Sequence, residues 1–181
     1  MTDTPSSTDA ASSTSQVAPI PEGAAGIIPH IVVADANAAI AFYVEAFGAV
    51  ETGRIPGPAG KVLHASVRIG DATLYLADDF PEMTGVSNTP KALGGISVAM
   101  HRFVEDVDAA VEKAVAAGAT LKMPPMDMFW GDRYAQIVDP ADHVWSLATH
   151  VRDVTSEEMT AAMEDMARQA AIANGDDIGD L

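Results

Sequence analysis

Apolar and polar residues follow two alternating periods along the chain, and the order of these periods occurs twice. Residues 28–33 are rich in β-branched residues, which predicts a strand. In the next stretch, 36–47, apolar residues fall on one stripe of a helix, namely Ala39, Ile40, Tyr43 and Phe47. Asp35 is a suitable N-cap for this helix, and Gly48 is a suitable residue to end it. Strands are then expected over 50–55, 61–69 and 73–77, with a tight turn at Gly70-Asp71.

The same order returns after a Pro- and Gly-rich connection over 79–95. Val104-Glu105-Asp106 repeats the chemistry of Val33-Ala34-Asp35, and Asp35 lies 13 positions before Gly48 as Asp106 lies 12 before Gly118. The expected second set is a strand over 96–104, a helix over 106–117, a short strand over 120–123, a loop over 124–132, and a hairpin with strands 134–138 and 143–149. The chain therefore predicts two βαβββ modules, residues 27–79 and 95–150.

Both ends of the chain lie outside this repeat. Residues 1–25 are rich in Ser, Thr, Pro and Ala and predict a disordered tail. In the segment 151–181, Thr155 and Glu158 fit a capping box for a helix running to about residue 173. Its apolar stripe would pack on the domain or on a second subunit, or would bind a separate partner; the stripe consists of Met159, Met163 and Met166.

Composition restricts the classes of partner and chemistry. The absence of cysteine excludes disulfides, thiolate metal sites and cysteine nucleophiles. A net charge of −16 disfavours nucleic acid and anionic membranes. No apolar run is long enough for a membrane span, and the N-terminus has no signal-peptide pattern, so we expect a cytoplasmic protein.

Several motifs resemble the vicinal oxygen chelate superfamily, which includes glyoxalases, bleomycin-resistance proteins and dioxygenases. The resemblance covers residues 27–150 and rests on Pro29–Val33, Ala41-Phe42-Tyr43 and Gly70–Leu74 in the first module, and on Val104–Asp108 and Ala116–Ala119 in the second. The stretch Phe129–Tyr134 with Asp139-Pro140 is similar to the PhnB-like branch.

This resemblance implies an α+β fold in which two tandem βαβββ modules form a cleft-shaped mixed β-sheet barrel, with the C-terminal helix added. The domain would span residues 26–150. It further implies a small-molecule ligand in the cleft and a homodimer. Metal-dependent relatives hold a divalent ion in the cleft, whereas metal-free relatives use the cleft to sequester compounds.

The positions that hold the metal in such relatives carry other residues here. The matching positions are Ile28, Ala99 and Ser146, and near the fourth position Tyr75 is the only polar side chain within 74–76. None of these is a usual ligand for Zn, Ni, Fe or Mn. The resemblance therefore leaves the divalent metal in doubt.

Two histidines lie two residues beyond the first two of these positions. His30 follows Ile28 and His101 follows Ala99, and a shift of two keeps the same face of a strand. His64 and His150 are expected near the same space. His30 and His101 are thus candidates for a displaced metal site, for binding or acid–base chemistry without metal, or for hydrogen-bonded histidines of the interior.

A second set of candidates follows the loop of the second module. Trp130 could stack on a flat ligand, and Arg133 could bind a carboxylate. Alternatively, Asp132 and Arg133 pair locally and Trp130 fills the module junction. The ligand-binding candidates are His30, His64, Tyr75, His101, Trp130 and Arg133. They allow a lyase, isomerase or dioxygenase acting on a small oxygenated metabolite, or a metal-free protein that sequesters a hydrophobic or planar compound.

Overall fold

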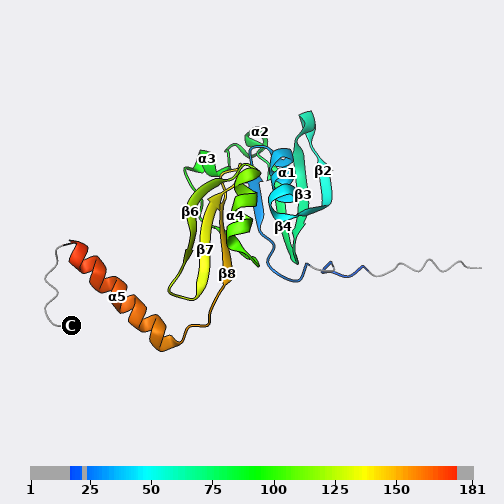
Figure 1. Ribbon diagram of the computed structural model, residues 1–181. Coiled ribbons are helices and arrows are strands. Elements are labelled where there is room, and N and C mark those ends of the chain that lie inside the picture. The colour runs from blue at the N-terminus through cyan, green and yellow to red at the C-terminus, as the bar shows by residue number, and fades with distance from the viewer. Residues whose placement is uncertain (1–16, 22–23, 175–181) are drawn as a thin grey trace, which may run out of the picture.

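A computed structural model describes residues 17–21 and 24–174 of the chain. The predicted N-terminal tail lies mostly outside these residues. The described part contains two four-stranded sheets with helices, as the sequence predicts (Figure 1). The fold class is α+β, built from two tandem βαβββ modules.

The first module forms a sheet with the strand order β1-β4-β3-β2. Strand β1 runs parallel to β4, and the remaining pairs are antiparallel. Its elements are β1 (His30–Val33), α1 (Ala36–Phe47), β2 (Val50–Pro56), the 3-10 turn η1 (Pro58–Gly60), β3 (Val62–Ile69) and β4 (Ala72–Asp78).

The second module repeats this topology with the order β5-β8-β7-β6 and a parallel β5–β8 pair. The short helices α2 (Pro81–Thr84) and α3 (Pro90–Leu93) lie in the connection. The elements of the module are β5 (Met100–Phe103), α4 (Val107–Ala116), β6 (Thr120–Asp127), β7 (Asp132–Val138) and β8 (Val144–His150).

The prediction of a loop over 124–132 is wrong for residues 124–127, because β6 continues to Asp127. Pro124 and Pro125 lie inside this strand. They are tolerated because β6 is an edge strand and its register with β7 shifts between Met123 and Met126. A strand expected over 96–104 is shorter in the structure and begins only at Met100.

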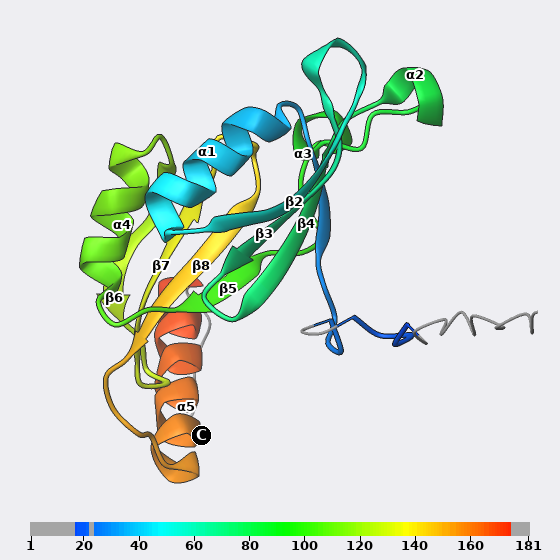
Figure 2. The same ribbon diagram turned by 90° about the vertical axis from the view of Figure 1, so that its right-hand side faces the viewer.

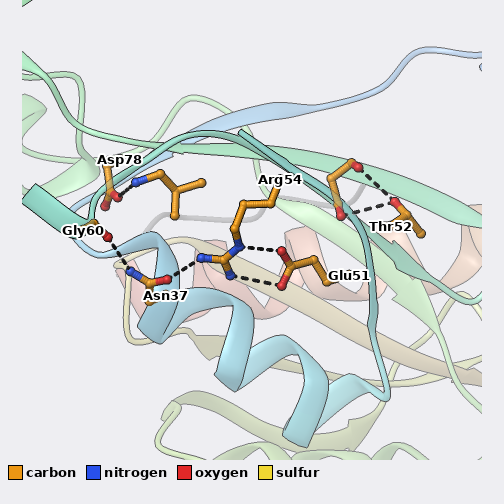
Figure 3. A network of polar contacts seen from close by, with 8 residues as sticks. Asn37, Glu51, Thr52, Arg54, Gly60 and Asp78 are labelled. Carbon is orange, nitrogen blue, oxygen red and sulfur yellow. Dashed lines mark hydrogen bonds and ion pairs between the residues drawn. The ribbon is translucent and has the colours of Figure 1, made fainter. Parts of the chain in front are cut away.

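Two carboxylates, exposed Asp35 and buried Asp78, fix the start of helix α1. The Asp35 side chain accepts from the backbone N–H of Ala38, as expected for an N-cap. Asp78 (Figure 3), at the end of β4, accepts two hydrogen bonds. The donors are the backbone N–H of Ala36 at 2.8 Å and that of Val62 at 2.5 Å. This one side chain therefore joins α1, β3 and β4.

Strand β2 is joined to α1 through side chains on the exposed edge. Arg54 donates to both carboxylate oxygens of Glu51 and to the side-chain oxygen of Asn37 (Figure 3). Asn37 in turn donates to the Gly60 carbonyl at 3.2 Å. These groups are solvent-exposed, so they fix geometry more than they add stability.

Both modules contribute to one hydrophobic core, and α1 lies beside α4 (Figure 2). Phe47 of α1 packs on Trp145 of β8 with ring centroids 4.6 Å apart. The Tyr43 hydroxyl donates to buried Asp139 at 2.7 Å, and the Trp145 Nε1–H donates to the same carboxylate oxygen at 3.0 Å. The two modules are thus connected by apolar burial and by one buried polar junction.

Helix α5 (Ser156–Asn174) extends away from the two modules (Figure 1). The predicted capping box is present: Glu158 accepts from the Thr155 backbone N–H at 2.8 Å, and Thr155 Oγ1 accepts from the Glu158 backbone N–H at 3.2 Å. Met163 and Met166 are more than half exposed, so the stripe does not pack on the chain's own domain. No helix among the described residues has the length and apolar character that crossing a membrane requires.

Candidate functional site

Each sheet has one face covered by helices and one face left open. Ala65 and Leu76, on the covered face of the first sheet, are fully buried in the core. Their chain neighbours His64 and Tyr75 point to the opposite side, because successive side chains alternate across a strand. This second side is called the open face below.

Three rings gather on the open face of the first sheet. His30 pairs with Tyr75 across the parallel β1–β4 ladder. The His64 ring lies 5.5 Å from that of His30 and 4.8 Å from that of Tyr75, in both cases edge to face. Partial burial lowers the pKa of His30, and the nearby His64 adds to this effect. At neutral pH the first-sheet cluster of His30, His64 and Tyr75 therefore offers a neutral imidazole.

The open face of the second sheet carries a corresponding aromatic row. His101 pairs with Ser146 across the parallel β5–β8 ladder, the same position that His30 occupies opposite Tyr75. The His101 ring stacks on Tyr134 at 6.2 Å, and Trp130 meets Tyr134 edge to face at 5.8 Å. His101, Trp130 and Tyr134 form the second-sheet cluster.

Hydroxyl and amide groups lie at the centre of the second open face. The hydroxyls of Tyr134 and Ser146 are 2.7 Å apart, and the Gln136 side-chain amide donates to Tyr134 at 2.8 Å. Ser146 is the position at which metal-dependent relatives carry a glutamate. It is occupied here by a hydroxyl that is already hydrogen-bonded.

An acid–base couple lies next to Trp130 at the end of the second-sheet cluster. Buried Asp132 accepts from Trp130 Nε1–H at 3.0 Å, and its other oxygen lies 2.9 Å from His150 Nδ1. Asp153 bonds the second ring nitrogen at 3.2 Å. The hydrogen bond to Asp132, with the one to Asp153, raises the pKa of His150. Sequence reasoning named Asp132 and His150 separately; the signal it missed is that the final hairpin places them opposite each other.

The structure does not place Arg133 with the other candidates. Its neighbours in β7 that share its face, Ala135 and Ile137, are fully buried in the core beside α4. Arg133 donates to both oxygens of Asp108 in α4 and to Asp127 at 3.0 Å. The predicted local pair with Asp132 is also wrong, because Arg133 and Asp132 lie on opposite faces of the strand.

The candidate metal positions do not assemble a ligand set. Ile28 and Ala99 line a common cavity but offer no donor side chain. Within the described residues, no three His, Asp or Glu side chains converge to hold a metal ion. His30 and His101 lie in separate ring clusters, so the residues present do not fit a divalent ion in the usual manner.

Comparison with known proteins agrees with this fold. The family model of the glyoxalase/bleomycin resistance protein/dioxygenase superfamily matches residues 27–147. Uncharacterised proteins of Mycobacterium tuberculosis and Mycobacterium bovis are each 52% identical over 136 residues. These cover 75% of this chain, and 80% and 90% of the two relatives.

Solved structures show the same architecture. A protein from Arabidopsis thaliana matches with a TM-score of 0.55 at 25% identity, over 68% of this chain and 97% of its own. A family enzyme from Burkholderia phytofirmans matches with a TM-score of 0.54 at 24% identity, over 67% and 95% of the two chains. The second likeness concerns the fold alone. On the match of the family model and the close mycobacterial relatives, the chain belongs to the glyoxalase/bleomycin resistance protein/dioxygenase superfamily.

Proposed function

We propose that the protein binds a small planar organic molecule on its open faces without a metal ion. The observation that carries this proposal is the repeated pairing of an imidazole with aromatic rings at equivalent positions of the two sheets, while Ile28, Ala99 and Ser146 occupy the usual ligand positions. Aromatic rings offer stacking surfaces, and neutral imidazoles offer one donor and one acceptor. On the similarity of residues 129–134 and Asp139-Pro140, we also propose that the chain belongs to the PhnB-like branch.

Large apolar side chains on the open faces support a covered site. Ile55 lies opposite His64 and is 54% exposed, and Phe103, two residues after His101, is 58% exposed. Met126 lies opposite Tyr134 and is 46% exposed. Contiguous exposed apolar surface is typical of a ligand or subunit interface. We therefore include a homodimer in the proposal, with the open faces covered by the second copy and by the bound compound.

Equilibrium binding of a panel of planar aromatic compounds tests the proposal. A compound that binds should raise the melting temperature, and dialysis against EDTA should leave this rise unchanged. His101→Ala and Trp130→Ala should each weaken binding, whereas Arg133→Gln, on the helix side, should not. Binding that disappears after EDTA treatment and returns with metal would refute the proposal.

Light scattering tests the dimer separately. The protein should have twice the mass of one chain, and Phe103→Glu should shift the mass toward the monomer because it buries a charge in an apolar contact. Val115→Glu, an exposed position on α4, is the matched control. A wild-type protein that is monomeric at all concentrations would remove the dimer and leave the ligand proposal standing.

A second candidate is an acid–base enzyme, favoured by the Asp132–His150 couple. A carboxylate on Nδ1 makes Nε2 the basic nitrogen, and Asp153, which now contacts Nε2, has a fully exposed side chain that a substrate can displace. The proton would move from the substrate to Nε2, as in an isomerase or lyase. NMR of bound compounds would show turnover that His150→Gln abolishes and Asp153→Asn retains; the absence of any turnover favours the binding protein.

A further inference from the structure

A cavity of about 450 Å³ lies between the two modules, and His101 of the second-sheet cluster is one of its lining residues. Its walls come from the residues before β1, from the β3–β4 hairpin and from β5, and Trp145 of β8 contributes to its base. Apolar residues form most of the wall, including Ile28, Ile69, Leu74 and Val98. Its volume is in the range of cavities that hold small organic ligands.

Arg102 of β5 brings a positive charge to this cavity. Its Nη1 donates to the Phe47 carbonyl at 3.3 Å, and its guanidinium lies 5.6 Å from the centre of the Phe47 ring. No carboxylate lies within ion-pair distance of it among the described residues, whereas Arg54, Arg133 and Arg152 each have one. In a chain of net charge −16, a half-buried arginine without a carboxylate is an exception.

The environment of Arg102 indicates that its charge is incompletely compensated. Burial lowers the pKa of the guanidinium, because the surroundings solvate the charge less well than water. An arginine does not lose its proton in proteins, so the cost of burial remains. Its planar fork has further N–H donors beyond the one bonded to Phe47, and this fork matches a carboxylate.

The other titratable groups that line the cavity do not satisfy Arg102. Asp71, in the β3–β4 turn, is exposed and is the only carboxylate that the described part of the chain brings to the wall. His101 also lines the cavity, and its ring stacks on Tyr134 and contacts Phe103. The wall therefore combines one cation, one distant exposed carboxylate and a mainly apolar surface.

We propose that the cavity between the modules binds a small apolar carboxylate, with its carboxylate on Arg102 and its apolar part against Trp145. This site shares His101 with the second-sheet cluster, but the recognition of the acid rests on Arg102 and does not depend on the proposed function. The apolar part of the ligand replaces water in the crevice, and the carboxylate completes the hydrogen bonding of the guanidinium. Recognition of this kind distinguishes an acid from its neutral amide.

The test compares cyclohexanecarboxylate with cyclohexanecarboxamide, which has nearly the same shape but no charge; neither compound has a planar ring that could stack on the open faces. Calorimetry should show that the wild-type protein binds the acid at least tenfold more tightly than the amide. Arg102→Gln should remove this preference, and Arg102→Lys should retain part of it. Arg68→Gln, which removes the same charge from an exposed position of β3, should leave the preference unchanged.

Two more variants locate the site. Ala99→Phe should fill the cavity and weaken the binding of both compounds, while Trp130→Ala on the open face should affect neither. Asp71→Asn should tighten the binding of cyclohexanecarboxylate only, because it removes the carboxylate of Asp71 from the wall. A loss in Arg102→Gln that is equal for acid and amide would show that Arg102 only supports the fold.

Two results overturn the proposal. The first is a wild-type protein that binds cyclohexanecarboxylate no better than cyclohexanecarboxamide, or binds neither. The second is a preference that survives Arg102→Gln but is lost in Trp130→Ala, which would assign the acid to the open face. Failure of planar compounds to bind the open faces would leave the Arg102 result unchanged, so the two proposals can fail independently.

Discussion

Removing one hydroxyl from the junction between the modules should destabilise the whole domain. The perturbation is Tyr43→Phe, which keeps the fully buried ring and its packing on Trp145 but removes the donor to Asp139. Burial raises the pKa of Tyr43 well above its usual value, and the neighbouring Asp139 adds to this effect. The phenol is therefore a protonated donor across the accessible pH range.

The expected cost follows from what Asp139 retains. One carboxylate oxygen keeps the backbone N–H donors of Ala141 and His143, both at 2.9 Å, and the other keeps Trp145 Nε1. The variant thus loses one of four hydrogen bonds to a buried carboxylate. A hydrogen bond to a charged group contributes about 1.5–3 kcal/mol, so the free energy of unfolding should fall by that amount.

Urea unfolding followed by circular dichroism measures this change. For a slope of about 2 kcal/mol per molar urea, the midpoint should fall by about 1 M. Tyr75→Phe is the control, because the Tyr75 hydroxyl makes no hydrogen bond within residues 24–174 and its loss should cost less than about 0.5 kcal/mol. A fall in Tyr43→Phe no larger than in this control would refute the view that the buried carboxylate connects the modules.

Three further predictions concern the charge of His150, two glycines with positive φ, and helix α5. Because Asp132 and a second carboxylate raise the pKa of His150, its pKa in the folded state exceeds that in the unfolded state. The stabilising contribution of charged His150 should therefore be complete below about pH 6.5 and lost as the pH rises through the folded-state pKa. An NMR titration of His150 should show a lower midpoint in Asp132→Asn. Gly48→Ala, at φ +66° with open space around the Cβ position, should lower the free energy of unfolding by about 1–2 kcal/mol. Gly131→Ala should lower it clearly more, because its Cβ would clash with the backbone before α5. Equal losses in chemical unfolding would contradict this reasoning. Deleting α5 should leave the melting temperature of the remaining domain within error, whereas a large fall would mean that the helix packs on the domain in solution.

The sequence predicts the first module closely because local signals agree there. Helix α1 spans 36–47 as expected, since an Asp35 N-cap and the left-handed Gly48 mark its ends. Strand β6 was predicted too short because Pro124 normally ends a strand in a sheet interior. The sequence does not reveal that β6 is an edge strand. On its outer side there is no neighbouring strand, so a proline without a backbone N–H breaks no hydrogen bond there.

The candidate site was predicted less completely because faces depend on strand register. His30 and His101 do occupy equivalent positions, since a shift of two residues from Ile28 and Ala99 preserves the face of both strands. Arg133 lies one residue before Tyr134, and this single step moves it to the helix side.

The two sheets share their topology but differ in the chemistry of their open faces. The first carries His30 and Tyr75 on paired strands, and no carboxylate of residues 17–21 or 24–174 is bonded to either ring. The second carries His101 and Ser146 at the equivalent places and adds a buried carboxylate, Asp132, with its bonded histidine. The histidine that is hydrogen-bonded to a carboxylate, His150, thus lies on the second sheet, while the first sheet offers aromatic rings and imidazoles. A ligand that contacts both faces would stack on the rings of the first sheet, and the Asp132–His150 pair of the second sheet would be available for proton exchange with it.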